Sequence, residues 1–153
     1  MTAKRANIEQ EMLREFIKIA KEHEYPLVLG QGSDNRIKLE GNLYFQFGDL
    51  RVDTPSSHVV IEVETAGGVT NLVKYWYCFK KRIITKPIVL LHIFKTSSKS
   101  DYGSHLLLWD YLWSSMNNDL GNQIVAKRFK VGTVNELGDA LKYFKEAILG
   151  KIK

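Results

Sequence analysis

The stretch that decides the fold is Gly48 to Glu64, GDLRVDTPSSHVVIEVE, in which apolar and polar residues alternate on both sides of a Thr-Pro-Ser-Ser segment. Such alternation predicts two β-strands, because successive side chains of a strand point to opposite faces. Proline and serine are typical turn residues, so we predict a β-hairpin. Glu62 and Glu64 must then share one face of the second strand.

The register of this hairpin predicts a cluster of carboxylates. A turn that is symmetric about Pro55 and Ser56 places Asp53 opposite His58 and Asp49 opposite Glu62. Directly opposed side chains lie about 5 Å apart, and opposed like charges destabilise a sheet. We therefore expect a cation beside Asp49 and Glu62, and oxygen ligands favour Mg²⁺ or Mn²⁺. The alternative is that these carboxylates lie on a solvated face, each near a lysine or arginine.

The composition is that of one globular domain spanning residues 1–153. Hydrophobic residues make up 44% and charged residues 25%, and the net charge of +5 makes nucleic acid a plausible partner. Because Cys78 is the single cysteine, an intramolecular disulfide and a cysteine-based zinc site are excluded. No apolar run approaches the ~20 residues of a membrane span. We expect a soluble cytoplasmic protein with no membrane association.

The rest of the chain predicts an α/β (α+β) fold with a central mixed β-sheet flanked by helices. Helices are expected at 8–22, 69–80, 104–117 and 134–149. In addition to the second arm of the hairpin, strands are expected at 36–40, 43–53, 88–94 and 123–131. The segment 25–35 is expected to be a loop with a short extended piece. Antiparallel strands come first in this order, and helix–strand alternation follows.

The first helix carries a carboxylate in an unusual place. We expect Asn7 to cap this helix, with Gln10 three residues on. The apolar stripe of the helix centres almost on Glu9, and a carboxylate facing a core is costly unless it is paired or ligates something. Alternatively, Glu9 sits in the exposed first turn, where the helix dipole favours an acid.

These features together resemble the PD-(D/E)XK, or restriction-endonuclease-like, nuclease superfamily. The resemblance covers residues 8–94, which match the family's αβββαβ core, and residues 100–150 would form an αβα extension. Gly48-Asp49 followed by Glu62-Val63-Glu64 matches the family motif. The resemblance implies that Asp49 and Glu62 hold one or two Mg²⁺ or Mn²⁺ ions, and that Glu9 adds a ligand from the first helix.

The chain departs from the family pattern at Glu64, which stands where the motif lysine is expected. That lysine is thought to orient the attacking water or to stabilise charge. Glu64 could serve as ligand or base, as in certain restriction endonucleases that resemble this chain. Lys74 could supply the lysine from the next helix, although its helical angle lies away from the apolar face. Asn71 and Tyr75 resemble the Gln-x-x-x-Tyr pair of some members. A third reading is an inactive site.

DNA would have to be held by basic residues around the acidic cluster. The candidates lie in the polar loop after residue 94 and on the strand near residue 128: Lys95, Lys99, Lys127, Arg128 and Lys130. The loop could equally be a solvated connection without a ligand.

The resulting hypothesis is a metal-dependent DNA endonuclease that hydrolyses phosphodiester bonds. A chain this small would cut both strands of a duplex only as a homodimer or as a subunit of a larger complex. The alternative is a catalytically inactive nuclease-fold module that binds DNA or protein, and a third reading is an unrelated α/β domain with a surface hairpin. Trp109 and Trp113 could form a dimer face or pack in the core.

Overall fold

The computed structural model describes residues 2–30, 32–65, 68–97 and 102–152, and describes side chains from residue 8 onward. The four α-helices are α1 (Thr2–Ala20), α2 (Thr70–Lys80), α3 (Gly103–Leu120) and α4 (Gly138–Ile148). The strands are β1 (Leu27–Leu29), β2 (Arg36–Lys38), β3 (Tyr44–Gln46), β4 (Leu50–Asp53), β5 (His58–Glu64), β6 (Ile88–Lys95) and β7 (Ile124–Val131). Short 3₁₀ turns occupy Ser33–Asn35, Gly121–Gln123 and Val134–Glu136.

Five strands form one mixed sheet in the order β1-β4-β5-β6-β7. β1, β4 and β5 are antiparallel neighbours, whereas β5, β6 and β7 run parallel to one another. β2 and β3 form a separate antiparallel pair. The fold is therefore α+β with a mixed sheet flanked by helices, as the element order predicts.

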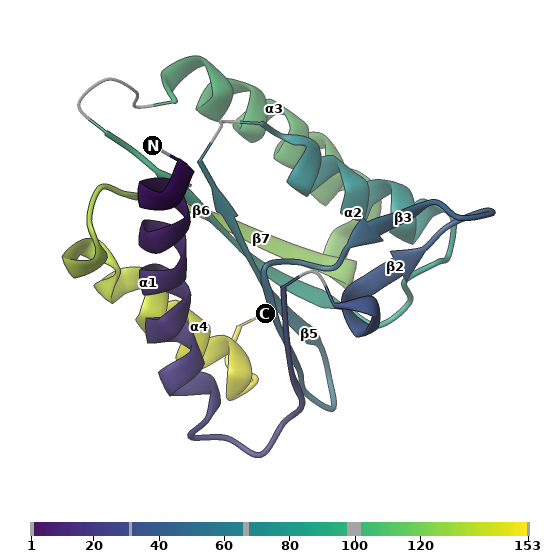
Figure 1. The fold of residues 1–153 in the computed structure, drawn as a ribbon. Coiled ribbons are helices and arrows are strands. Elements are labelled where there is room, and N and C mark those ends of the chain that lie inside the picture. Colours follow the sequence, from purple (N-terminus) through teal and green to yellow (C-terminus); the bar gives the residue numbers. More distant parts are fainter. Residues whose placement is uncertain (1, 31, 66–67, 98–101, 153) are drawn as a thin grey trace.

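Helices cover both faces of the sheet (Figure 1). α1 and α4 pack together on one face, and α2 and α3 pack together on the other. Each face has its own apolar core, with Phe16 and Phe144 buried on the α1–α4 side and Leu72 and Phe94 on the α2–α3 side. The central strands β5 and β6 are buried on both faces, which explains the continuous apolar run IVLLHIF in β6.

The predicted hairpin forms in the predicted register. Asp53 pairs with His58 and Leu50 with Ile61. Gly48 ends the preceding extended segment, so the expected single strand 43–53 is wrong and is divided into β3 and β4. Gly48 has φ +84°, and a Cβ at this position would lie 2.5 Å from Cγ1 of Val60. No other residue fits this bend without displacing a core side chain.

The predicted start and N-cap of the first helix are wrong. α1 begins at Thr2, so Asn7 lies inside the helix and does not cap it. The segment Ala3 to Ala6 consists of alanine, lysine and arginine, which favour helix and extend it toward the N-terminus. The segment 25–35 contains a short extended piece as predicted: it is β1, which pairs with β4 and forms one edge of the sheet.

The buried face of α2 differs in part from the expected one, and α3 decides between the two alternatives left open for its tryptophans. In α2 the buried residues include Lys74, Tyr75 and Cys78, whereas Val73 is exposed. In α3, Trp109 is buried, and Trp113 packs against the same core. The two tryptophans thus belong to the core and not to an exposed face. Among the described residues, none of the helices combines the length and hydropathy that a membrane crossing requires.

Candidate active site

Two strand ends and one helix bring the acidic residues together. Asp49 directly precedes β4, and its backbone N–H donates to the carbonyl of Ile61 at 2.8 Å. Its carboxylate turns toward β5, where Oδ2 accepts the N–H of Val63 at 2.7 Å. Gln46 Nε2 donates to Oδ1 at 3.1 Å. These three bonds hold Asp49 at the end of β5 next to Glu62, one residue beyond the last pair of the ladder, Leu50 with Ile61.

Glu62 is the most buried of these acids, with 2% of its surface exposed. Tyr75 donates its hydroxyl to Glu62 Oε2 at 2.7 Å, and Lys74 Nζ lies 2.5 Å from the same oxygen. Burial raises the pKa of Glu62 to about 7, because desolvation and the charge of Asp49 outweigh the ammonium of Lys74. Tyr75 is fully buried, and its pKa is raised well above 10, so the phenol keeps its proton as a donor.

Lys74 occupies the centre of the site, contrary to the expectation that its side chain points away. Only 7% of Lys74 is exposed. Its ammonium donates to the carbonyl of Gln46 at 2.8 Å and to Oδ1 of Asn71 at 3.2 Å, in addition to its ion pair with Glu62. Leu72 and Phe79 of the expected apolar face are buried, but the position of Lys74 was predicted wrongly, because hydropathy alone does not show the ion pair that draws the lysine inward.

Glu64 and Glu9 complete the acidic cluster. Glu64 is 8% exposed, and burial raises its pKa although the backbone N–H of Gly68 stabilises its charge. Burial and the charge of Asp49 raise the pKa of Glu9. Glu9 and Asp49 line the same cleft of about 540 Å³ between α1 and the strands. Because α1 begins at Thr2, Glu9 is not in the first turn, and that alternative is wrong.

The mutual repulsion of these carboxylates is the observation that bears on whether they could hold a divalent cation. The charge of Asp49 raises the pKa of Glu9 on α1 and of Glu62 and Glu64 on β5, so three carboxylates repel the one of Asp49. A divalent ion relieves such repulsion, and its preferred ligands are carboxylate oxygens. In the described part of the chain, however, no three His, Cys, Asp or Glu side chains already surround a common metal position. Lys74 supplies the positive charge at Glu62.

His92 lies next to Glu62 on β6 and was not expected at the site. It is fully buried, and burial together with the charge of Lys74 lowers its pKa to about 3, so the ring is neutral. Trp109 Nε1 donates to His92 Nδ1 at 3.0 Å. This bond requires the proton to be on Nε2, which has no hydrogen-bond partner among the described residues.

The expected DNA-binding residues do not form one surface. Register places Arg128 in the row of Glu62 and Lys130 in the row of Glu64, two strands away on the same face. Arg128 is paired with Asp110 at 2.9 Å. Lys127 points to the opposite face, where its ammonium lies 5.1 Å from the ring centre of Tyr143. Strand alternation therefore separates residues that are adjacent in sequence.

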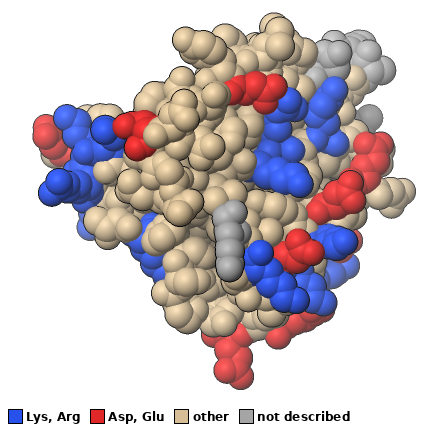
Figure 2. All heavy atoms as spheres, turned by 180° about the vertical axis from the view of Figure 1, so that it is seen from behind, with Lys and Arg blue, Asp and Glu red and all other residues tan. Residues whose placement is uncertain are grey.

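The loop candidates contribute less. Lys95 donates to the carbonyl of its neighbour Thr96 at 2.6 Å. Lys99 lies outside the described residues. Figure 2 shows lysine and arginine in separate groups on the back of the molecule, with uncharged surface between them.

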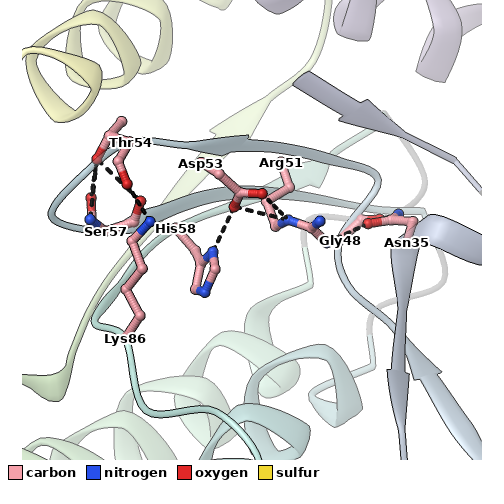
Figure 3. A network of polar contacts seen from close by, with 8 residues as sticks. All are labelled: Asn35, Gly48, Arg51, Asp53, Thr54, Ser57, His58 and Lys86. Atoms are coloured by element: carbon pink, nitrogen blue, oxygen red, sulfur yellow. Dashed lines mark hydrogen bonds and ion pairs between the residues drawn. The ribbon is translucent and has the colours of Figure 1, made fainter. Parts of the chain in front are cut away.

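Sequence reasoning missed a polar network that joins the hairpin to the segment before it. Asp53 accepts from His58 Nδ1 at 2.5 Å and from Arg51 Nε at 3.0 Å (Figure 3). Arg51 also donates to Asn35 Oδ1 at 2.9 Å, and Asn35 Nδ2 donates to the carbonyl of Gly48 at 2.8 Å. The network ends beside Asp49 and holds the backbone that presents it. Only the pairing of Asp53 with His58 could be foreseen, from the register.

No family model, curated protein or solved structure matches the chain. The chemistry of the site therefore has to be argued from its own residues.

Proposed function

We propose that this chain is a metal-dependent DNA nuclease that hydrolyses phosphodiester bonds, with a restriction-endonuclease-like arrangement of its core. The observation that supports this proposal most directly is that the side chains of Asp49, Glu62 and Lys74 lie close together. The family-like motif lacks its lysine at position 64, and the ammonium of Lys74 lies beside the carboxylates instead.

In this proposal Asp49 and Glu62 hold the divalent cation, and Glu64 and Glu9 add negative charge at the margin of the site. When bound, Mg²⁺ or Mn²⁺ would neutralise the phosphate and lower the pKa of a bound water. Lys74 stabilises negative charge that develops on the phosphate. Gln46 and the N–H of Val63 hold the carboxylate of Asp49 in place, and Tyr75 does the same for Glu62.

The rigid support of these side chains favours catalysis over accidental clustering. Asp49 and Glu62 each receive at least two contacts from the protein, so neither has to be ordered when substrate arrives. A single such site attacks one strand. Cleavage of both strands of a duplex therefore calls for a second copy of the chain or a second binding event.

A DNA-binding module without catalysis is the second candidate, and one observation favours it. Lys74 and Tyr75 already satisfy Glu62 Oε2, so the acid is stable without a metal. Under this candidate the lysine replaces the cation, and the site keeps only its capacity to bind.

Cleavage assays separate the two candidates. The purified chain is incubated with plasmid, single-stranded and branched DNA in Mg²⁺, Mn²⁺ or EDTA. The nuclease proposal predicts metal-dependent cleavage that Asp49→Asn abolishes and that Glu22→Gln, an exposed charge-matched control, leaves intact. DNA binding without cleavage of any substrate would leave the binding module. Absence of both metal and DNA binding would contradict both candidates.

A further inference from the structure

A second pocket, remote from the acids, is lined by basic groups. It has a volume of about 440 Å³ and lies between β2, the start of β5 and the segment that follows α2. Its charged and titratable lining residues are Arg36, Lys38, His58 and Lys86. No aspartate or glutamate of the described chain is among the lining residues. Positive groups gathered around a hollow without acids provide an electrostatic site for an anion.

Asp53 holds His58 through one ring nitrogen, Nδ1, which leaves the other ring nitrogen, Nε2, for a ligand in the pocket. Its Nδ1 lies 2.5 Å from Asp53, and Asp53 is held in turn by Arg51. Phe47 packs against the imidazole with ring centres 5.0 Å apart. Figure 3 shows the far ring nitrogen pointing away from Asp53, with Lys86 on the same side of the strands. Both residues line the pocket, where the ammonium of Lys86 donates to the carbonyl of Thr54 and keeps further N–H groups for a ligand.

Two packed routes connect this pocket to the acidic site. His58 and Glu62 lie on the same face of β5, four residues or roughly 13 Å apart. Between them, Phe47 contacts both His58 and Tyr75, and Tyr75 donates to Glu62.

The second route runs through the polar network. It leads from Asp53 through Arg51 and Asn35 to the carbonyl of Gly48, the residue before Asp49. An anion in the pocket would consequently sit at a fixed distance from both acids.

We propose that the pocket formed by Arg36, Lys38, His58 and Lys86 binds a phosphate group of a nucleic-acid strand. The pocket itself requires no catalysis. Its role in presenting a neighbouring phosphodiester to Asp49 and Glu62 rests on the proposed nuclease function. The separation is too large for the bound phosphate to be the one cleaved, so it is a second phosphate of the same strand.

Inorganic phosphate is the simplest probe of the pocket. Titrating it into the protein at constant pH and ionic strength, while following the imidazole signals by NMR, should shift the His58 signals saturably and leave those of His23 unchanged. The variant Arg36→Ala/Lys38→Ala should weaken this response about tenfold, because it removes two cations. The variant Lys127→Ala/Lys130→Ala removes the same charge on β7 and should not. Equal, unsaturated shifts at both histidines, or equal losses in both variants, would overturn the proposal.

Labelled single-stranded DNA distinguishes a backbone phosphate from a terminal one. Binding is measured in EDTA with two oligonucleotides that differ only in a 5′-phosphate or a 5′-hydroxyl. For a backbone phosphate, both should bind equally, and both should lose about tenfold affinity in Arg36→Ala/Lys38→Ala. If the pocket binds a terminal phosphate, the 5′-phosphorylated strand should bind the wild type more tightly than the 5′-hydroxyl strand. Only the phosphorylated strand should then lose affinity in Arg36→Ala/Lys38→Ala. Unchanged binding of both strands by this variant would contradict the pocket.

The two proposals fail separately. Phosphate binding without DNA cleavage under any metal condition would remove the nuclease proposal and keep the pocket. Metal-dependent cleavage that is unaffected by Arg36→Ala/Lys38→Ala and by His58→Gln would remove the role of the pocket in presenting DNA and keep the nuclease.

Discussion

The two ends of strand β5 carry opposite charge on the same face. At the C-terminal end, carboxylates outnumber cations, because Lys74 pairs with Glu62 while Asp49 and Glu64 lie close by and Glu9 approaches from α1. At the N-terminal end, cations surround a pocket and one carboxylate orients the imidazole: Arg36, Lys38, Lys86 and His58 with Asp53. One end is suited to a cation and the other to an anion.

The difference shows how one rigid strand can hold two complementary ligands. Excess acid is tolerated at one end because Lys74 and Tyr75 support Glu62 there. Excess base is tolerated at the other because its long side chains reach solvent or backbone carbonyls, as Lys86 does at Thr54. A nucleic-acid strand with a bound divalent ion matches both ends. Charge changes at the acidic end and on the neighbouring strand β7 test this difference.

The largest effect is expected at the acidic end. Asp49→Asn and Glu62→Gln should each reduce metal-dependent DNA cleavage by at least about 100-fold, since each removes a charge from the proposed cation site. Initial rates on the best substrate provide the measurement. Glu22→Gln, which alters an exposed acid of equal charge, should cleave at the wild-type rate. If Asp49→Asn cleaves DNA at the wild-type rate, Asp49 is not part of the catalytic site.

Removing the charge of Lys74 should destabilise the folded protein, because Glu62 at the acidic end loses its ion pair. Lys74→Met leaves Glu62 buried without its ion pair, which should lower the free energy of unfolding by about 3–5 kcal/mol above pH 8. Denaturant unfolding measures this loss. The double variant Lys74→Met/Glu62→Gln should recover part of it, because the uncompensated charge is gone. Equal stability of Lys74→Met and the wild type would contradict the buried pair.

The acidic end should also make stability depend on pH. The folded pKa of Glu62 is about 7, against 4.5 for an ordinary glutamate, so the folded state binds the proton more tightly than the unfolded state. Its stabilising contribution is complete below pH 4.5 and is lost as pH rises to about 7, by on the order of 3 kcal/mol.

The matched variant isolates this contribution. Because Asp49, Glu9 and Glu64 shift in the same direction, the difference between wild type and Glu62→Gln across pH 4.5–8 is the quantity to measure. Saturating Mg²⁺ should reverse the wild-type loss at neutral pH, because the cation binds the ionised acids. Parallel pH profiles for the two proteins would rule out the raised pKa.

The smallest effect is expected on β7. Lys130 shares the face and row of Glu64, whereas Lys127 lies on the opposite face against Tyr143. Lys130→Ala should therefore lower the salt dependence of DNA binding by about one unit of slope, and Lys127→Ala should leave it unchanged. Binding isotherms at several salt concentrations measure both. Equal slopes for the two variants would show that DNA does not follow this face.

The sequence predicted the hairpin and its register because strand alternation and turn residues are local signals. The pairing of Asp53 with His58 and the position of Asp49 beside Glu62 followed from them. The mixed sheet and its covering helices followed from the element order. These features depend on short-range periodicity, which a single sequence displays.

Lys74 could not be placed in the same way. A helical wheel ranks positions by hydropathy, and by that measure Val73 should be buried and Lys74 exposed. The structure reverses them, because Glu62 offers a buried partner from a strand ten or more residues away. The basic pocket was missed for the same reason, since Arg36, His58 and Lys86 come from separate elements. Long-range ion pairs leave no periodic trace in the sequence.

The central claim, a divalent cation held by Asp49 and Glu62, is tested most directly by a crystal structure of the protein soaked in Mn²⁺. We expect an anomalous peak between the two carboxylates, with oxygen ligands at roughly 2.0–2.2 Å, and we expect the ammonium of Lys74 to have moved away from Glu62 Oε2. An absent peak at high Mn²⁺, with Lys74 still paired to Glu62, would contradict it.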